Sequence, residues 1–266
     1  MRHCVIALLA CFALPSPGMA IDLNLYTALL KDHTRETSDL AAVRVDYASL
    51  RTDPRWKRLV ASLEASDPKS LHDRNEQLAF WFNAYNILAI DLVVTHAPRG
   101  SIKDIGSLFS PVWKKSAGTI AGKAYTLDEI EHEIVRPMGD PRAHAAVICA
   151  SLSCPPLLRE PWRAQRLDAQ LDAQVRVWLT HPEKGLRLNR AKKTLYLSRI
   201  FQWFAEDFEA RGGVLAFVTE YAPESDAAWL RSHGAGVRIR YLDYDWKLNA
   251  LGRHANWQGA ESAKKL

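Results

Sequence analysis

The chain has 266 residues, of which 48% are hydrophobic and 24% are charged, with 35 Lys and Arg residues against 30 Asp and Glu residues. This composition is typical of a globular protein and excludes collagen-like, low-complexity and acidic disordered chains. A net charge of +5 is small for a chain of this length, so we expect no nucleic acid as a partner.

The first twenty residues have the pattern of a secretory signal peptide. Residues 1–3 form a short basic start, residues 4–14 are apolar, and residues 18–20 place small side chains before a cut near Ala20. The apolar stretch is too short to cross a bilayer. We therefore expect a periplasmic or secreted protein with no stable membrane insertion after cleavage, and the sequence leaves its oligomeric state open.

Hydrophobic periodicity predicts one α+β domain over residues 21–266. Helices are expected over residues 22–34, 45–65 with a break at Asp53-Pro54, 75–95, 126–135, 167–179, 200–210, 213–221 and 224–232. Hairpins are expected over residues 119–125 and 186–197, and single strands over residues 143–149 and 237–242. The segment 75–95 is apolar nearly all round, which predicts a buried core helix.

Polar side chains interrupt two of the apolar segments. Glu76, Asn83 and Asn86 share one stripe of the helix expected over residues 75–95, and buried polar groups need hydrogen bonds. They either hold neighbouring loops or line a site, where the two asparagines would position a substrate. Glu131 lies inside the apolar arc of the next expected helix, where it either pairs with Arg136 or Arg142 or orients a histidine.

Two cysteines remain once the signal peptide is removed. In a strand over residues 143–149, His144 and Cys149 point to opposite faces, which predicts a packed, inert Cys149. Cys154 lies in a loop of small residues before Pro155-Pro156, a pattern that favours a helix start able to stabilise a thiolate. The same pair could instead form a local disulfide in an oxidising compartment. The chain contains no zinc-binding motif, and we expect no metal or cofactor.

Five ordered blocks resemble a bacterial domain-of-unknown-function family, numbered 547, over about residues 45–249. The blocks are LAFWFNAYN (78–86), TLDEIEHEIVR (126–136), DPRAHAAVICASLSCPPL (140–157), SRIFQWFAEDF (198–208) and YLDYDWKLN (241–249). The resemblance implies a papain- or transglutaminase-like fold, here with a long buried core helix and a small antiparallel sheet. It also implies a Glu–His–Cys constellation that hydrolyses amide bonds, with glutathione or similar small thiol peptides as the substrate class.

Carried onto this chain, the resemblance makes Cys154 the nucleophile, His144 its base and Glu131 the residue that orients the imidazole. Glu76, His132 and Cys149 are the alternates for these roles. The resulting hypothesis is an exported cysteine-dependent hydrolase of peptide or isopeptide bonds. Arg136 and Arg142, beside the site blocks, would suit a substrate that carries a carboxylate, with Arg142 positioning it.

Two other functions fit the same residues. One is a non-catalytic exported binding domain in which a Cys149–Cys154 disulfide and the polar stripe are structural. The other is a thiol-redox protein that uses this pair of cysteines.

Overall fold

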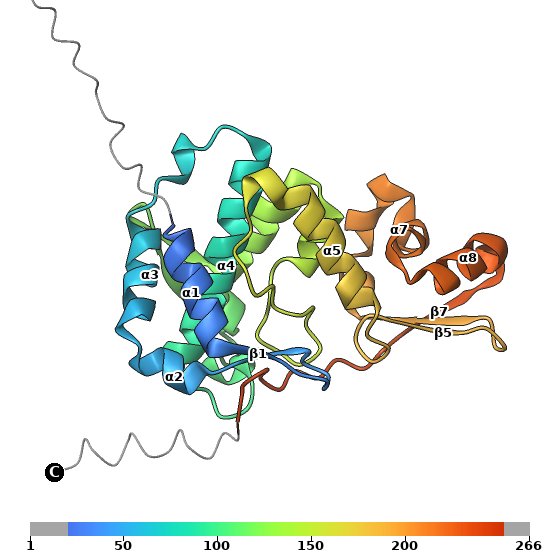
Figure 1. Ribbon diagram of the computed structural model, residues 1–266, viewed down its shortest axis with the longest axis horizontal. Helices are drawn as coiled ribbons and strands as arrows, with labels where there is room; N and C mark the ends of the chain where they lie inside the picture. The colour runs from blue at the N-terminus through green and yellow to red at the C-terminus, as the bar shows by residue number, and fades with distance from the viewer. Residues whose placement is uncertain (1–20, 253–266) are drawn as a thin grey trace, which may run out of the picture.

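The computed structural model describes residues 21–252, so the predicted signal peptide lies outside the described residues. The buried side chains form two hydrophobic clusters. The first gathers around the N-terminal helices and the second around the C-terminal helices and sheet, which lie at opposite ends of the molecule in Figure 1. The architecture mixes helices with small sheets, in agreement with the predicted α+β class.

The N-terminal helices follow the predicted ranges closely. The helices are α1 (Leu23–His33), α2 (Tyr47–Thr52) and α3 (Pro54–Glu64). An antiparallel hairpin of β1 (Thr34–Glu36) and β2 (Val43–Val45) connects α1 to α2. The predicted break at Asp53-Pro54 is confirmed. Asp53 caps α3 through its side chain, and Pro54 occupies the first helical position, where its missing N–H costs no hydrogen bond.

Helix α4 (Arg74–His96) forms the centre of the first cluster, as predicted. By length and composition it could cross a membrane, but 83% of its most apolar 18-residue window is buried inside the protein. It begins at the Asp73 side-chain cap and ends at Ala97, which adopts a left-handed conformation with φ 47°. Burial on nearly every side explains why its sequence is apolar nearly all round.

The buried amides of α4 brace the backbone of two later segments. Asn86 donates to the carbonyl oxygen of Ala146 at 2.8 Å and accepts from the N–H of Ile148 at 2.9 Å. Asn83 makes the same pair of bonds to the carbonyl and N–H of Trp162, at 2.8 and 2.9 Å. Each amide satisfies two backbone groups, and leaving a buried group unpaired costs about 1–3 kcal/mol.

A hairpin and a widened helical turn follow α4. Strands β3 (Ser116–Ile120) and β4 (Lys123–Thr126) pair antiparallel around Ala121-Gly122, both of which have positive φ. Thr126 and Glu129 form a capping box, in which they exchange side-chain and backbone hydrogen bonds of 2.8 and 3.0 Å. The turns that follow are π-helical over η4 (Glu129–Val135), a geometry often found at functional sites.

The predicted strand over residues 143–149 is wrong. Residues Pro141–Ala145 form the 3-10 helix η6, capped by the Asp140 side chain, and the following residues run without regular structure to Cys149. The Asn86 side chain forms hydrogen bonds with the carbonyl of Ala146 and the N–H of Ile148. In a sheet, these backbone groups would pair with a neighbouring strand. The predicted helix start at Cys154 is wrong as well, because residues 155–163 contain no helix.

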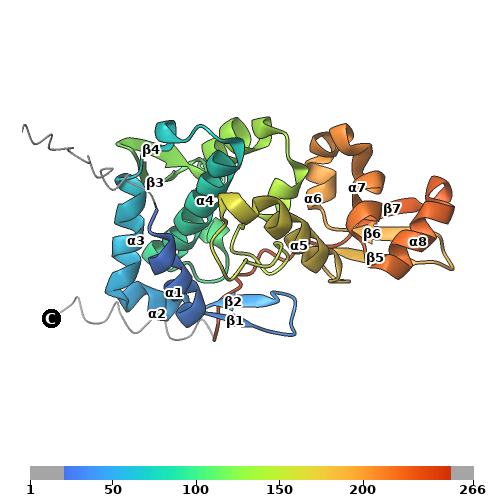
Figure 2. The same cartoon turned by 45° about the horizontal axis from the view of Figure 1, so that its top comes forward.

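The C-terminal half builds the second cluster. Its elements are α5 (Leu167–Leu179), β5 (Leu186–Asn189), β6 (Thr194–Leu197), α6 (Ile200–Trp203), η8 (Ala205–Arg211), α7 (Gly213–Tyr221), α8 (Glu224–His233) and β7 (Arg238–Tyr241). Strand β6 pairs antiparallel with β5 but parallel with β7, so this sheet is mixed rather than purely antiparallel as predicted. Figure 2 shows the three small sheets at separate places around the helices.

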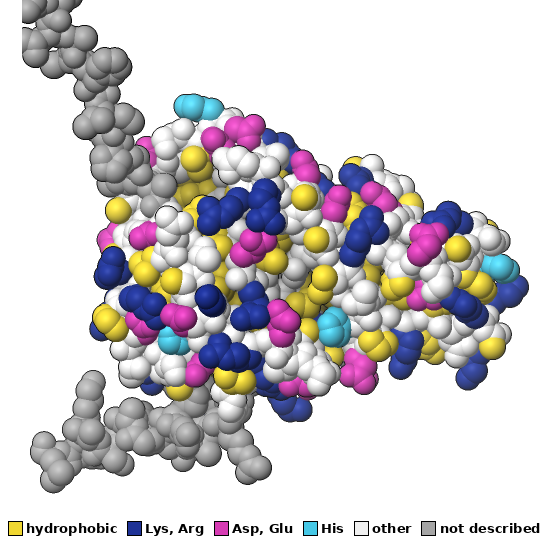
Figure 3. Space-filling view, in the orientation of Figure 1, with side chains coloured by type: hydrophobic (Ala, Val, Ile, Leu, Met, Phe, Trp, Pro, Cys, Tyr) yellow, Lys and Arg dark blue, Asp and Glu magenta, His cyan; other side chains and the backbone are white. Residues whose placement is uncertain are grey.

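Short 3-10 turns connect these elements. They are η1 (Pro68–Ser70), η2 (Ile102–Ile105), η3 (Val112–Lys114), η5 (Arg136–Met138), η7 (Ala164–Arg166) and η9 (Gly234–Gly236). On the face shown in Figure 3, basic and acidic side chains are interspersed over the surface. The small surplus of positive charge is therefore not gathered into one patch on this face.

Candidate active site

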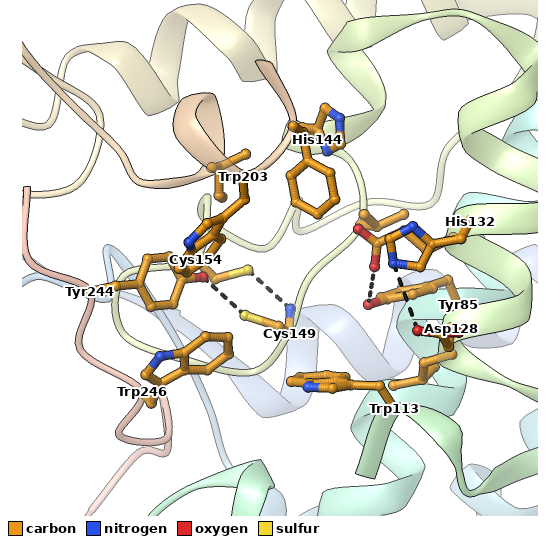
Figure 4. Close-up of a pocket in the computed structure, with 15 residues that line it drawn as sticks. Tyr85, Trp113, Asp128, His132, His144, Cys149, Cys154, Trp203, Tyr244 and Trp246 are labelled. Carbon is orange, nitrogen blue, oxygen red and sulfur yellow. Dashed lines mark hydrogen bonds and ion pairs between the residues drawn. The ribbon is translucent and has the colours of Figure 1, made fainter. Parts of the chain in front are cut away.

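A pocket of about 160 Å³ lies where the two hydrophobic clusters meet. One side is built by α4, η4 and the segment from η6 to Cys154, and the other by the segment 200–204 and the chain that follows β7. Figure 4 shows two cysteines, two histidines and several aromatic side chains around it. The pocket therefore gathers most of the chemistry-bearing residues that the sequence singled out.

The two cysteines lie in one short loop of the pocket wall. Both are free; Cys149 is half-buried and Cys154 is 4% exposed. The N–H of Cys149 donates to the sulfur of Cys154 at 3.0 Å, and buried Ala150 between them has φ 57°. A left-handed alanine stores backbone strain that the surrounding structure must maintain, a feature that recurs at functional sites.

Distant segments hold this cysteine loop in place. Leu152 N–H donates to the carbonyl of Lys247 at 2.8 Å, and Asp245 N–H donates to the Ser153 hydroxyl at 2.8 Å. Buried Lys184 donates to the carbonyl of Leu152 at 3.4 Å, and burial lowers the pKa of Lys184 to about 8. The position of the sulfurs therefore depends on residues more than 30 positions away in sequence.

The surroundings of the two sulfurs favour Cys149 as the thiolate. Burial opposes its ionisation, but hydrogen bonds from Cys154, Ser151 and Tyr244 outweigh burial and lower its pKa to about 7. The Ser151 and Tyr244 hydroxyls lie 3.0 and 3.1 Å from the Cys149 sulfur. Burial and the adjacent Cys149 raise the pKa of Cys154 well above its usual value. These contacts favour Cys149 over Cys154 as the sulfur that ionises, whereas the sequence pattern favoured Cys154.

His144 is held by a carboxylate that the sequence analysis did not single out. Its Nε2 lies 2.7 Å from Oδ2 of Asp207, and its ring stacks on Phe204 with centroids 4.4 Å apart. Burial opposes ionisation of Asp207, but hydrogen bonds from His144 and Arg136 hold the pKa of this carboxyl well below its usual range. An ionised carboxylate only accepts, so Nε2 carries a proton, and in the neutral ring Nδ1 is the nitrogen with the free lone pair. His144 therefore has the tautomer of a general base.

His132 has the opposite arrangement. Its Nδ1 lies 2.8 Å from a guanidinium nitrogen of Arg136, and a guanidinium only donates, so the Nδ1 lone pair is already used. Its Nε2 then carries the proton and lies 3.8 Å from Oδ1 of Asp128. Of the two imidazoles in the pocket, His144 is the one with a free lone pair.

Glu131 lines the pocket but orients neither imidazole. Its Oε2 accepts from the hydroxyl of Tyr85 at 3.1 Å. Tyr85 is buried, and burial together with Glu131 keeps its pKa well above the ordinary value, so it remains a donor. The carboxylate that contacts His144 is that of Asp207, which lies 63 residues after His144 in the block at residues 198–208.

The other sequence-predicted residues lie outside the pocket lining. Glu76 is exposed in the first turn of α4, and the amides of Asn83 and Asn86 are occupied by the backbone bonds described above. Arg142 is 9% exposed and bonds Asp140, Asp168 and Asp172, each at 2.7 Å. These placements indicate structural roles, so the expected substrate-positioning function of Asn83, Asn86 and Arg142 is not supported.

An aromatic wall beside the cysteines was also missed. It consists of Trp113, Trp203, Tyr244 and Trp246, with ring centroids 4.6–6.0 Å apart. Trp203 is 44% exposed, which is unusual for so large an apolar side chain. Two of these rings belong to the block YLDYDWKLN, but only the fold brings them together with Trp113 and Trp203.

The pocket separates the sulfurs from the imidazoles. Within residues 21–252 no hydrogen bond joins either sulfur to a histidine, and the two cysteines face His132 and Tyr85 across the cavity in Figure 4. Catalytic hydrogen bonds are often long before substrate binds. The same described residues contain no group of three or more His, Cys, Asp or Glu that could hold a metal ion.

Comparison with known proteins connects this pocket to one family. Residues 68–179 match the DUF547 family. The family is described as a protein of unknown function, and neither a curated protein nor a solved structure matches the chain. The DUF547 segment contains both cysteines, both pocket histidines, Glu131 and Tyr85, whereas Asp207 and most of the aromatic wall come from the chain that follows it.

Proposed function

We propose that the protein is a cysteine-dependent hydrolase of amide bonds, with Cys149 as nucleophile, His144 as general base and Asp207 as the residue that orients His144. One observation carries this proposal. A thiol whose pKa is lowered to about 7 shares a pocket with an imidazole whose Nε2 is fixed by a carboxylate, so that Nδ1 is free to accept a proton.

The proposed reaction proceeds through a thioester. His144 first accepts the proton of the Cys149 thiol. The thiolate attacks the carbonyl carbon, and the tetrahedral intermediate breaks the C–N bond as protonated His144 gives that proton to the leaving amine. Water then attacks the thioester while His144 accepts a proton from it, which releases the carboxylic acid and restores the thiolate. The hydroxyl of Tyr244, 3.1 Å from the Cys149 sulfur, is the donor placed to stabilise the oxyanion. Its pKa lies well above the ordinary value, mainly because of burial, so it keeps its proton.

We also propose a relation to a known class of enzymes and export from the cell. One is a relation to papain- and transglutaminase-like enzymes, supported by a cysteine and a carboxylate-held histidine that line the same pocket. The other is export through the signal peptide at residues 1–20, which would place the thiol in an oxidising compartment.

Alkylation of the full chain by iodoacetamide tests which thiol reacts. Because the pKa of Cys149 is lowered to about 7, its thiolate forms about two pH units below that of an ordinary cysteine with a pKa of 9.0. We expect the alkylation rate of Cys149 to rise with a midpoint near pH 7, while Cys154 reacts slowly at every pH below 9. Peptide mapping after timed quenching gives both rates.

The Tyr244→Phe variant provides the control for this measurement. It removes one hydrogen bond to the sulfur and keeps the ring, so the Cys149 midpoint should move to higher pH. Faster modification of Cys154 than of Cys149, or a Cys149 midpoint near 9, would show that the nucleophile is wrongly assigned.

A thiol–disulfide exchange protein is the second candidate. It is favoured by two free thiols in one short loop, one with a lowered and one with a raised pKa, each affected by the other. The two functions differ in what they require of Cys154. Exchange needs Cys154 to resolve a mixed disulfide, so Cys154→Ser would abolish exchange, whereas a hydrolase that uses Cys149 would lose less than about tenfold in that variant.

A further inference from the structure

The pocket presents two chemically different walls to a ligand. The aromatic wall described above lies beside the cysteines, and a second wall from η4 and the residue that precedes it carries the carboxylates of Asp128 and Glu131. In Figure 4 the Asp128 side of the pocket faces Trp246 and the cysteines across the open space. A ligand in the pocket therefore contacts both walls.

The carboxylates of the second wall lack a cationic partner within residues 21–252. Glu131 accepts a hydrogen bond from the neutral hydroxyl of Tyr85, and Asp128 has His132 at 3.8 Å. No lysine or arginine in the described part of the chain forms an ion pair with either. The nearby guanidinium of Arg136 already bonds Glu206, Asp207 and His132. These two carboxylates are therefore available to bind a positively charged group of a ligand.

The aromatic wall suits the same kind of ligand. Aromatic faces attract cations and pack against alkyl chains, and Trp246 already shows this with Lys103, whose Nζ lies 3.7 Å from the ring centroid. The expectation of a carboxylate-bearing substrate relied on Arg136 and Arg142. Both are occupied by acidic side chains of the protein, so they supply no free positive charge to the pocket.

We propose that the pocket selects amides that carry an ammonium group on an alkyl chain, as a lysine side chain does. Glu131 and Asp128 bind the ammonium group, and the aromatic wall contacts the alkyl carbons. This inference rests on the proposed function, because it places the amide of such a substrate at the Cys149 sulfur. It differs from the glutathione-like class implied by the family resemblance, whose members carry more carboxylates than ammonium groups.

Binding of two small amides to the full-length Cys149→Ser variant tests the proposal without requiring catalysis. The probes are 6-aminohexanamide and hexanamide, which differ in the ammonium group, and the readout is the shift of the indole N–H resonances of Trp113, Trp203 and Trp246. We expect 6-aminohexanamide to bind at least tenfold more tightly than hexanamide. The preference should weaken as salt is added, because screening reduces charge–charge attraction.

Two glutamine variants separate the acidic wall from general surface charge. Glu131→Gln should reduce the preference for 6-aminohexanamide to less than threefold. Glu133→Gln, on the same helical turn but exposed and outside the pocket, should leave it unchanged. Equal binding of the two amides, or a preference that survives Glu131→Gln, would overturn the proposal. Because the readout is binding and not turnover, this result is independent of whether Cys149 is the nucleophile.

Discussion

Replacing Cys149 with serine is expected to lower turnover of an activated ester such as p-nitrophenyl acetate by at least about 10⁴-fold. Loss of a catalytic nucleophile costs up to about 10⁶-fold in comparable enzymes. A serine hydroxyl in this position lacks the low pKa that the Ser151 and Tyr244 hydroxyls help to give the thiol, so it would not ionise near neutral pH. Release of p-nitrophenol measures the loss directly.

The matched control is Cys154→Ser, in the same loop. Cys154 donates a hydrogen bond that helps to lower the pKa of Cys149, so this variant should lose less than about tenfold and its pH profile should move upward. Melting temperatures of both variants show whether the loop still folds. Equal losses in the two variants, or a larger loss at Cys154, would refute the assignment of Cys149.

Replacing Asp207 with asparagine is expected to lower kcat by about 10³–10⁴-fold with little change in KM. The amide group of asparagine can donate to Nε2 of His144, which would move the imidazole proton to Nδ1 and remove the lone pair that the mechanism needs. The corresponding change in a serine protease triad costs about 10⁴-fold. Steady-state kinetics of the ester give both parameters.

Glu206→Gln separates this role from the salt bridge that Asp207 shares with Arg136. Glu206 also bonds Arg136 at 2.7 Å, but it is exposed and does not contact His144. We expect Glu206→Gln to keep kcat within about threefold. If Asp207→Asn kept as much kcat as Glu206→Gln, or changed only KM, Asp207 would not be the residue that positions the imidazole.

Local sequence signals predicted most of the helices and hairpins. The break at Asp53-Pro54, the capping box at Thr126 and Glu129, and the long core helix all depend on residues within one or two turns of each other. Such signals are contained in the sequence itself, because capping and periodicity act over three to five positions.

The errors arise where distant residues decide the local structure. The expected strand at residues 143–149 does not form because Asn86, some 60 positions earlier, takes its backbone hydrogen bonds. Without that strand, the argument that His144 and Cys149 face opposite sides no longer applies, and both line one pocket. Periodicity in a seven-residue apolar segment cannot reveal such a partner.

The sequence predicted only part of the candidate site, because contacts between distant residues also decide which residues meet there. The pocket brings together His144, Glu131, His132 and both cysteines, all of which the sequence singled out. The roles within it depend on Asp207, 63 residues after His144, and on Tyr244, 95 residues after Cys149. Both residues lie in blocks of the family resemblance, but nothing local places those blocks beside His144 and Cys149. Sequence analysis could therefore name the two cysteines but not the one that the surroundings favour as the thiolate.

The identity of the residue that carries the acyl group during turnover tests the central claim most directly. The full chain is mixed with p-nitrophenyl acetate, quenched in acid within the first turnover, and fragmented by mass spectrometry between Cys149 and Cys154. We predict an acetyl group as a thioester on Cys149, accumulating further in His144→Ala because the thioester then lacks the base that activates water. An acetyl group on Cys154, or no acyl group on either sulfur, would contradict the account.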